Sequence, residues 1–320
     1  MATDSPISGA SRPDAGAATR HTSDHPLFIQ LAPFVFVFFW STGFIGARYG
    51  LPYAEPFTYL TLRMAIATTV MVGLTIILRS GWPGTLAQAG HIAVSGLLLH
   101  AGYLGGVFFA IDRGMPAGIS ALVVGLQPIL TAIVATALLS EHVNSRQWLG
   151  LMLGFAGVAV VVIERMRVND SGDRSTALLA DIAIFVALLS TTAGAIYQKR
   201  FGAMMPLASG TAIQYGATGI AVGMIALATE SMNINWTARF IFALSWQVIV
   251  LSLLAITLLM ILIRQNSVSR LSSYLYLVPP LTAIEAYLLF DERLSVAAIG
   301  GMALVVLGVA LVVVKRGART

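Results

Sequence analysis

Three aromatic or polar side chains stand inside stretches of the chain that are otherwise apolar. His100 lies at the centre of the run 90–112, and Tyr103 follows three residues later on the same face of a helix. Trp40 lies well inside the run 27–47, although membrane tryptophans usually lie at the ends of such runs. An imidazole, a phenol and an indole at this depth can hydrogen-bond to a ligand and stack on it, or they can serve only in packing. We interpret all three as candidates for the wall of a cavity.

One carboxylate and one guanidinium also lie inside apolar runs. Glu285 shares a helix face with Tyr274, Val278 and Leu281 at helical spacings. It can carry a proton, recognise an amine, reach the membrane interface, or form a buried pair with Arg63 from an earlier run. Arg63 by itself is interpreted as structural, because a long cationic side chain can snorkel to the interface or cap helix carbonyls.

Prolines interrupt two of the runs near their middle. Pro128 follows Gln127 within the run 116–139, and Pro279 lies within the run 268–290. A proline in a helix interior removes a backbone hydrogen bond and clashes with the preceding turn. The sequence therefore predicts that both helices kink at the membrane midplane, either as a pair of hinges or as two static bends.

The elements that position these residues are transmembrane helices. Apolar residues make up 57% of the 320 residues and charged residues 10%, whereas soluble domains carry roughly a quarter charged residues. Ten apolar runs have about 20 residues each, which is the length that spans a bilayer. These runs cover residues 27–47, 56–78, 90–112, 116–139, 146–164, 177–198, 209–229, 242–264, 268–290 and 295–314. We therefore predict an all-α integral membrane protein with ten transmembrane helices.

The two prolines belong to a tandem duplication with a shift of 151 residues. The segment QPILTAIVATALLSEH at 127–142 aligns with VPPLTAIEAYLLFDER at 278–293, and Gly150 aligns with Gly301. Each copy holds five predicted helices, so the second copy must start from the opposite side of the membrane. The sequence thus predicts two inverted five-helix repeats around a central cavity, an architecture found in secondary transporters.

The predicted organisation has two repeats and three short connecting or terminal parts. These are a disordered tail over 1–26, a first repeat over 27–164, a linker over 165–176, a second repeat over 177–314 and a tail over 315–320. The first tail has no apolar segment, so we do not interpret it as a signal peptide. Eleven Lys and Arg residues fall on the side of the N-terminus and seven on the other side, which predicts that both termini are cytoplasmic.

Several functional classes lack the residues that they need. The chain has no cysteine, no phosphate-binding loop, no zinc-protease motif and no pattern of an intramembrane protease. We therefore predict that it is not an enzyme and has no catalytic residues, no metal site and no cofactor. The basic residues form no cluster, which excludes nucleic acid as a predicted partner. The predicted partners are the lipid bilayer and a small-molecule substrate, and the sequence does not define an oligomeric state.

The motifs resemble those of EamA-type transporters in the drug/metabolite transporter superfamily. The resemblance rests on Trp40-Ser41, on Arg63, and on Pro128…Leu139-x-Glu141…Gly150…Gly157 with its echo Pro279…Phe290-x-Glu292…Gly301…Gly308. Trp40 together with His100-x-x-Tyr103 resembles the YddG-type amino-acid exporters. The resemblance implies a bacterial inner-membrane exporter with a basket-shaped bundle and a central cavity. Carried over to this chain, the implied wall comprises Trp40, His100, Tyr103, Gln127 and Tyr274.

The function predicted on this basis is export of amino acids with aromatic or apolar side chains, by alternating access. Trp40 and Tyr103 would contact the side chain, and Gln127 and His100 the polar groups. Glu285, Pro128 and Pro279 would serve in coupling or gating. The alternatives are efflux of cationic or hydrophobic drugs and, from another class, a membrane sensor or assembly partner that transports nothing. The second repeat has Leu251 where the first has His100, so the predicted site is not symmetric.

Overall fold

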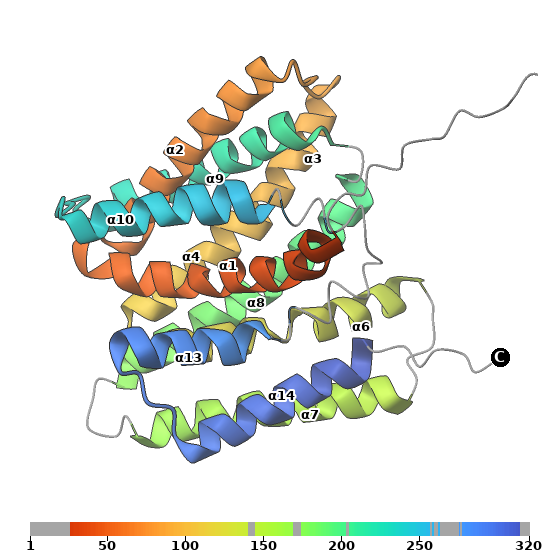
Figure 1. Cartoon of the computed structure of the whole chain (residues 1–320), viewed down its shortest axis with the longest axis vertical. Coiled ribbons are helices and arrows are strands. Elements are labelled where there is room, and N and C mark those ends of the chain that lie inside the picture. Colours follow the sequence, from red (N-terminus) through yellow and green to blue (C-terminus); the bar gives the residue numbers. More distant parts are fainter. Residues whose placement is uncertain are drawn as a thin grey trace, which may run out of the picture.

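The computed structural model describes residues 26–139, 145–168, 174–202, 205–256 and 277–313, and the single residues 258, 262 and 275. Within these ranges the regular secondary structure is helical, apart from one isolated antiparallel bridge between Ala54 and Ile234. The helices pack together in one bundle and cross at differing angles (Figure 1).

The first half of the chain forms α1 (Pro26–Gly50), η1 (Leu51–Tyr53), α2 (Pro56–Ile77), α3 (Leu86–Gly96), η2 (Leu97–Gly102), α4 (Tyr103–Asp112), α5 (Ala117–Val124), α6 (Gln127–Leu139) and α7 (Ser145–Val168). The second half forms α8 (Arg174–Phe201), α9 (Leu207–Thr229), α10 (Ala238–Trp246), η4 (Gln247–Ala255), α13 (Val278–Phe290) and α14 (Val296–Val313). The helices α3, η2 and α4 follow one another without a break, and so do α10 and η4.

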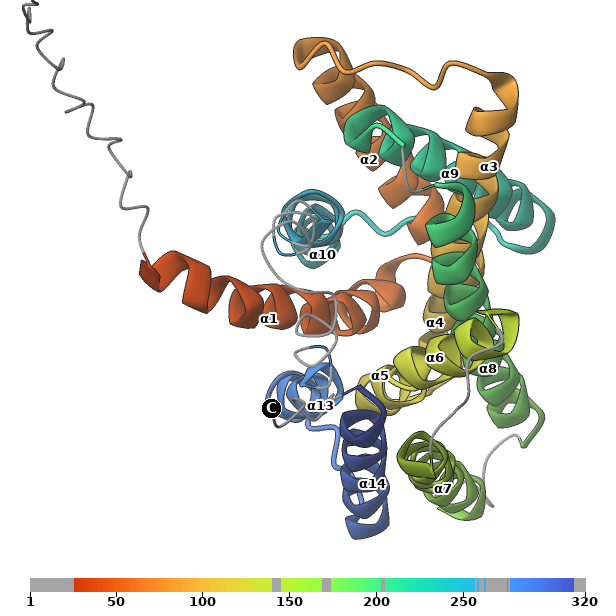
Figure 2. The same ribbon diagram turned by 90° about the vertical axis from the view of Figure 1, so that its right-hand side faces the viewer.

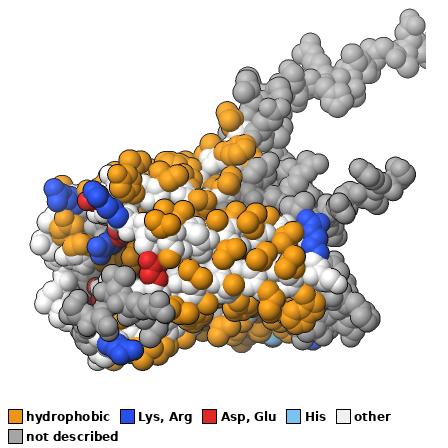
Figure 3. Space-filling model, turned by 90° about the horizontal axis from the view of Figure 1, so that it is seen from below, with side chains coloured by type: hydrophobic (Ala, Val, Ile, Leu, Met, Phe, Trp, Pro, Cys, Tyr) orange, Lys and Arg blue, Asp and Glu red, His pale blue; other side chains and the backbone are white. Residues whose placement is uncertain are grey.

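Six of these helical stretches are long and apolar enough to cross a membrane. Four shorter apolar helices occupy the remaining predicted runs, at Ala117–Thr131, Trp148–Glu164, Val278–Phe290 and Val296–Leu311. Large apolar side chains are exposed on the outside of the bundle, such as Leu227 at 73% and Leu288 at 72%. Hydrophobic side chains cover the middle of the face in Figure 3, and basic side chains lie toward its two ends. A surface of this kind suits lipid and not water.

Pairs of helices from the two halves pack side by side. α2 packs against α9, and α7 packs against α14, at opposite edges of the bundle (Figure 2). Between these pairs, α1 contacts α13 and α10, whereas α8 contacts α6 and α3. By the 151-residue shift, α1 corresponds to α8, α6 to α13 and α3 to α10. The contacts of α1 with α13 and α10 are therefore matched by the contacts of α8 with α6 and α3.

Glycines allow the close contact between α7 and α14. A Cβ atom added to Gly301 would lie 2.6 Å from the carbonyl oxygen of Gly157, and one added to Gly308 would lie 2.5 Å from that of Gly150. Small residues let helix backbones approach within the membrane, where apolar side chains gain nothing by leaving lipid.

The two prolines lie at helix starts and not inside continuous helices. α5 ends at Val124, and Pro128 is the second residue of α6. Pro279 likewise lies in the first turn of α13. A proline in the first turn leaves no backbone donor unpaired, because the first N–H groups of a helix have no partner within it. The predicted kink is therefore a break between two helices in the first repeat, where the structure describes both sides of it.

The break in the first repeat lies against Pro279 of the second repeat. A Cβ atom added to Gly125, which ends α5, would lie 3.1 Å from Cγ of Pro279. α5 packs along α13, so the start of α13 lies beside the break between α5 and α6.

The structure also has two wide helical turns that the sequence did not predict. η2 and η4 are π-helices, and the 151-residue shift carries residues 97–102 onto 248–253, which lie within η4. Neighbouring helices donate hydrogen bonds to carbonyls at the first of these turns: Ser190 Oγ to Leu98 O at 2.9 Å, and Thr218 Oγ1 to Gly96 O at 3.1 Å. Turns of this type occur frequently at functional sites.

Candidate functional site

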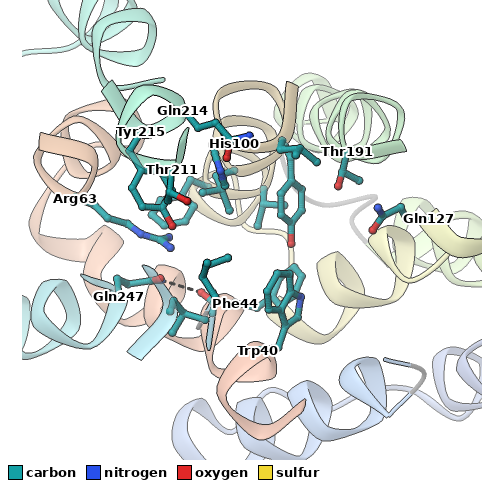
Figure 4. A pocket seen from close by; sticks show the side chains of 18 of the residues that line it. Trp40, Phe44, Arg63, His100, Gln127, Thr191, Thr211, Gln214, Tyr215 and Gln247 are labelled. Carbon is teal, nitrogen blue, oxygen red and sulfur yellow. Dashed lines mark hydrogen bonds between the residues drawn. The ribbon is translucent and has the colours of Figure 1, made fainter. Parts of the chain in front are cut away.

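An interior cavity of about 290 Å³ lies where helices of the two halves meet (Figure 4). Its wall takes side chains from α1, α2, η2, α4 and α6 of the first half and from α8, α9 and η4 of the second. Both π-helices contribute to the wall, the first through Leu99 and His100 and the second through Gln247 and Leu251.

Four of the five predicted wall residues line this cavity, namely Trp40, His100, Tyr103 and Gln127. The fifth, Tyr274, lies outside the described residues. Phe36 extends the aromatic wall beside Trp40, with 5.3 Å between the ring centroids. The ring of His100 meets the ring of Tyr215 edge to face at 5.0 Å.

Glu285 is not among the residues that line the cavity. Its Oε1 accepts a hydrogen bond from Ser41 Oγ at 2.7 Å, which ties α13 to α1. Arg63 makes its hydrogen bonds to Ser252 instead, so the described residues do not show the pair of Glu285 and Arg63 that the sequence allowed.

Arg63 belongs to the cavity wall, which the sequence analysis did not predict. Its side chain is almost completely buried, and its Nε and Nη2 atoms both lie 3.3 Å from Ser252 Oγ. Tyr215 donates a hydrogen bond to the carbonyl oxygen of the same serine at 3.1 Å. Arg63 therefore reaches the interior of the bundle instead of snorkelling to the membrane surface.

The repeat predicts two further wall residues. A shift of 151 residues carries Trp40 onto Thr191 and Arg63 onto Gln214, and all four line the cavity. Gln214 Nε2 donates hydrogen bonds to Ser95 Oγ at 2.9 Å and to the side chain of Gln198 at 3.2 Å. The duplication was thus a signal that could have identified Thr191 and Gln214 from the sequence.

The duplication does not predict Gln247 as a wall residue, because the 151-residue shift pairs it with Gly96. Its side chain is completely buried and lines the cavity. The amide nitrogen donates to the carbonyl oxygen of Gly43 at 2.9 Å. That acceptor fixes the orientation of the amide, and the Oε1 atom has no hydrogen-bond partner among the described residues. Gly46 permits this approach, since a Cβ atom there would lie 2.8 Å from the Gln247 amide nitrogen.

Polar contacts join the helix ends on one side of the bundle. Arg48, near the end of α1, forms an ion pair with Glu292 at 3.3 Å. The same carboxylate accepts a hydrogen bond from the backbone N–H of Ala117, the first residue of α5, at 3.0 Å. Burial raises the pKa of Glu292, while Arg48 and the Ala117 amide act in the opposite direction.

A second set of contacts joins α2 and the segment after α9 on the same side. Glu230 accepts hydrogen bonds from the backbone N–H groups of Phe57 and Thr58 at 2.8 and 2.7 Å, in the first turn of α2. Glu55 accepts two from Ser231. A carboxylate at a helix N-terminus satisfies free N–H groups and interacts favourably with the helix dipole.

A family model described as the EamA-like transporter family matches residues 27–163 and again residues 178–314. The chain belongs to the EamA-like transporter family. It contains two EamA domains, and the second matched range is the first shifted by 151 residues. The first domain supplies Trp40, Arg63 and His100 to the cavity, and the second supplies Gln214 and Gln247.

Relatives of this EamA protein include two that are named as transporters. The "Uncharacterized transporter YvbV" of Bacillus subtilis (strain 168) is 26% identical over 88% of this chain and 90% of its own length. The "Uncharacterized inner membrane transporter YedA" of Escherichia coli (strain K12) is 28% identical over 91% of each chain. The "Protein PecM" of Dickeya dadantii (strain 3937) is 24% identical over 82% of this chain and 84% of its own length. The EamA protein described here is therefore a multi-pass membrane transporter.

A solved structure shares this fold. It comes from a crystal structure of a protein that is 20% identical in sequence, and it superposes with a TM-score of 0.62 over 89% of this chain and 96% of that one. The likeness supports the all-helical EamA fold and carries no information on substrate.

The side chains that line the EamA cavity can recognise a ligand. Among the described residues that line it, the charged side chain is the guanidinium of Arg63, and none is a carboxylate. No group of three His, Asp or Glu residues in the described part of the chain could hold a metal ion. Aromatic and amide side chains form much of the remaining wall, which suits a small ligand with an apolar part and polar groups.

Proposed function

We propose that this EamA transporter exports small metabolites, and in particular amino acids with aromatic or apolar side chains, across the bacterial inner membrane. The observation that carries the proposal is the aromatic-walled cavity between the two domains. Substrate sites of transporters built from repeats lie at this place, at the interface of the repeats.

The size of the cavity favours a small substrate. About 290 Å³ lies just below the roughly 300–1,000 Å³ that pockets for small molecules occupy. Phe36 and Trp40 offer a stacking face for an apolar or aromatic side chain, because buried aromatic rings combine a large contact area with preferred geometries. The described wall has no carboxylate to receive a cationic drug.

Alternating access is the mechanism proposed for this architecture. The exchanged helix contacts support two repeats related by a pseudo-two-fold axis. The odd number of helices predicted for each repeat makes the proposed arrangement inverted. The contacts of Arg48, Glu292, Glu55 and Glu230 close one side of the bundle. With both termini in the cytoplasm, this closed side faces outward, and transport requires these contacts to break and re-form.

We expect Trp40→Ala and His100→Ala each to lower phenylalanine export by about tenfold, which corresponds to roughly 1.4 kcal/mol of lost substrate stabilisation. The alanines remove a stacking surface and a hydrogen-bonding group from the wall. Flux of labelled phenylalanine from proteoliposomes measures the effect. Trp148→Ala is the matched control, because Trp148 is half exposed on α7 and does not line the cavity.

Equal flux through the parent and both cavity variants would place the substrate elsewhere. Purified protein that moves cationic drugs but no amino acid would instead establish drug efflux as the function. Each variant is first checked for unchanged thermal stability in detergent, so that a loss of flux reports on the site.

The proposed orientation predicts the labelling of single cysteines, which this cysteine-free chain accepts without background. Asn233 lies exposed between α9 and α10, and Gly84 lies exposed between α2 and α3. On intact cells, a membrane-impermeant thiol reagent is expected to label Asn233→Cys and to spare Gly84→Cys. Permeabilised cells provide the control, in which both positions react. The reverse pattern on intact cells would place both termini outside.

A further inference from the structure

The buried guanidinium of Arg63 has more donors than partners. The group carries five N–H donors in a planar fork, and the described residues give it a single acceptor, the hydroxyl of Ser252. No carboxylate among them lies within ion-pair distance of it. A charge buried without a counter-charge is costly, by several kcal/mol. An anionic group from outside the protein would relieve this cost.

No Asp or Glu lines the cavity beside Arg63 among the described residues. The stretch 257–276, most of which the structure does not describe, contains no Asp or Glu in its sequence. Glu285 binds Ser41, while Glu55 and Glu230 bind groups at the closed end of the bundle. The charge of Arg63 has no equivalent in the second repeat, because the 151-residue shift carries Arg63 onto the neutral Gln214.

Gln247, whose backbone binds the same serine as Arg63, carries a side-chain acceptor that is unpaired among the described residues. Ser252, which binds Arg63, also donates its hydroxyl hydrogen to the carbonyl oxygen of Gln247 at 3.2 Å. The side chain of Gln247 is completely buried, and its Oε1 atom has no partner among the described residues. A buried carbonyl oxygen without a donor costs free energy in the empty cavity, and an ammonium group would supply the donor.

The side chains of Arg63 and Gln247 lie on one side of the cavity, and the aromatic wall lies on the other. Figure 4 shows Arg63 and Gln247 at one side, with the guanidinium directed into the cavity, and Trp40 at the other. A ligand with a carboxylate and an ammonium on one carbon atom, and an apolar group on the other end, matches this arrangement.

We propose that Arg63 binds the carboxylate and Gln247 Oε1 the ammonium of an α-amino acid, whose side chain extends toward Trp40. This inference rests on the proposed function and narrows it, since it makes a carboxylate a requirement for transport. The guanidinium fork can bind a carboxylate in a bidentate manner, which a lysine ammonium cannot reproduce. Gln127 and His100, which the sequence predicted to contact the polar groups of the substrate, would then make only additional contacts with it.

Three compounds that differ in one group test the proposal on the unaltered protein. Unlabelled phenylalanine, 3-phenylpropionate and 2-phenylethylamine compete with labelled phenylalanine for transport by proteoliposomes. We expect 2-phenylethylamine, which lacks the carboxylate, to compete more than about 100-fold less well than phenylalanine. We expect 3-phenylpropionate, which lacks only the ammonium, to be weaker by about tenfold, since it loses a contact to a neutral acceptor.

Variants assign the effect to the two residues. Arg63→Gln and Arg63→Lys are both expected to lower phenylalanine transport by more than about tenfold, and Arg63→Gln is expected to reduce the preference for phenylalanine over 2-phenylethylamine. Gln247→Leu is expected to reduce the preference for phenylalanine over 3-phenylpropionate. Arg113→Gln is the control, because Arg113 lies at the end of α4 and outside the cavity.

The outcomes separate this inference from the proposed function. Transport of phenylalanine with equal competition by 2-phenylethylamine would overturn the carboxylate site and leave transport standing. A folded Arg63→Gln protein with the selectivity of the parent would do the same. If none of the three compounds crosses the membrane, the proposed function fails as well.

Discussion

Gly301→Leu is expected to destabilise the protein by about 3 kcal/mol, at the upper end of typical overpacking effects. A Cβ atom at this position would lie 2.6 Å from the carbonyl oxygen of Gly157 and 2.6 Å from a methyl group of Val161. The carbonyl is backbone, so no rotamer change can relieve the contact. α14 must therefore move away from α7, and the packing of the whole helix pair is weakened.

Gly300→Leu is the matched control on the same helix. Nothing lies within 4 Å of a Cβ atom at Gly300, which is exposed on the side of α14 that faces away from α7. Leucine has the higher helix propensity by up to about 1 kcal/mol, so this variant is expected to be as stable as the parent or slightly more so. Thermal denaturation in detergent, followed by the loss of monodisperse protein, compares the two. Equal midpoints for both variants would show that α7 and α14 do not pack through their glycines.

A disulfide between α5 and α13 is expected to stop transport almost completely, with recovery on reduction. A Cβ atom added to Gly118 would lie 3.3 Å from Cβ of Ala283, slightly closer than the roughly 3.5–4.5 Å typical of disulfides. Gly118→Cys and Ala283→Cys can therefore be bridged by a small shift of the backbone. The bridge would hold the closed side of the bundle together, next to the contact between Glu292 and Ala117.

Alternating access gives the physical reason for this expectation. The substrate can leave through the closed side only when α5 and α13 separate there. Flux of labelled phenylalanine is measured before oxidation, after oxidation and after dithiothreitol, and mass spectrometry confirms the disulfide. Each single cysteine serves as a control that should transport under all three conditions. Full flux through the oxidised, bridged protein would show that these helices stay together during transport.

The sequence determined the class of the protein, its helices and its duplication. The run lengths fixed the helix positions, because each membrane-spanning helix satisfies its own backbone hydrogen bonds and needs only enough apolar residues. The shift of 151 residues reappears in the two EamA matches and in the placement of the two π-helices. Trp40, His100 and Tyr103 could be singled out because polar and aromatic residues are rare at that depth.

Only the tertiary structure decided which polar side chains share the cavity. Glu285 and Arg63 looked alike in the sequence as charges inside apolar runs, yet Glu285 binds Ser41 between two helices and Arg63 enters the cavity wall. Gln247 reaches the wall through a π-helix, which places it against Gly43 and Gly46 of α1. The direction of a side chain depends on the rotation of its helix, and that rotation is set by packing against several other helices at once. No single run of sequence contains this information, so the anchor proposed for the substrate emerged only from the assembled bundle.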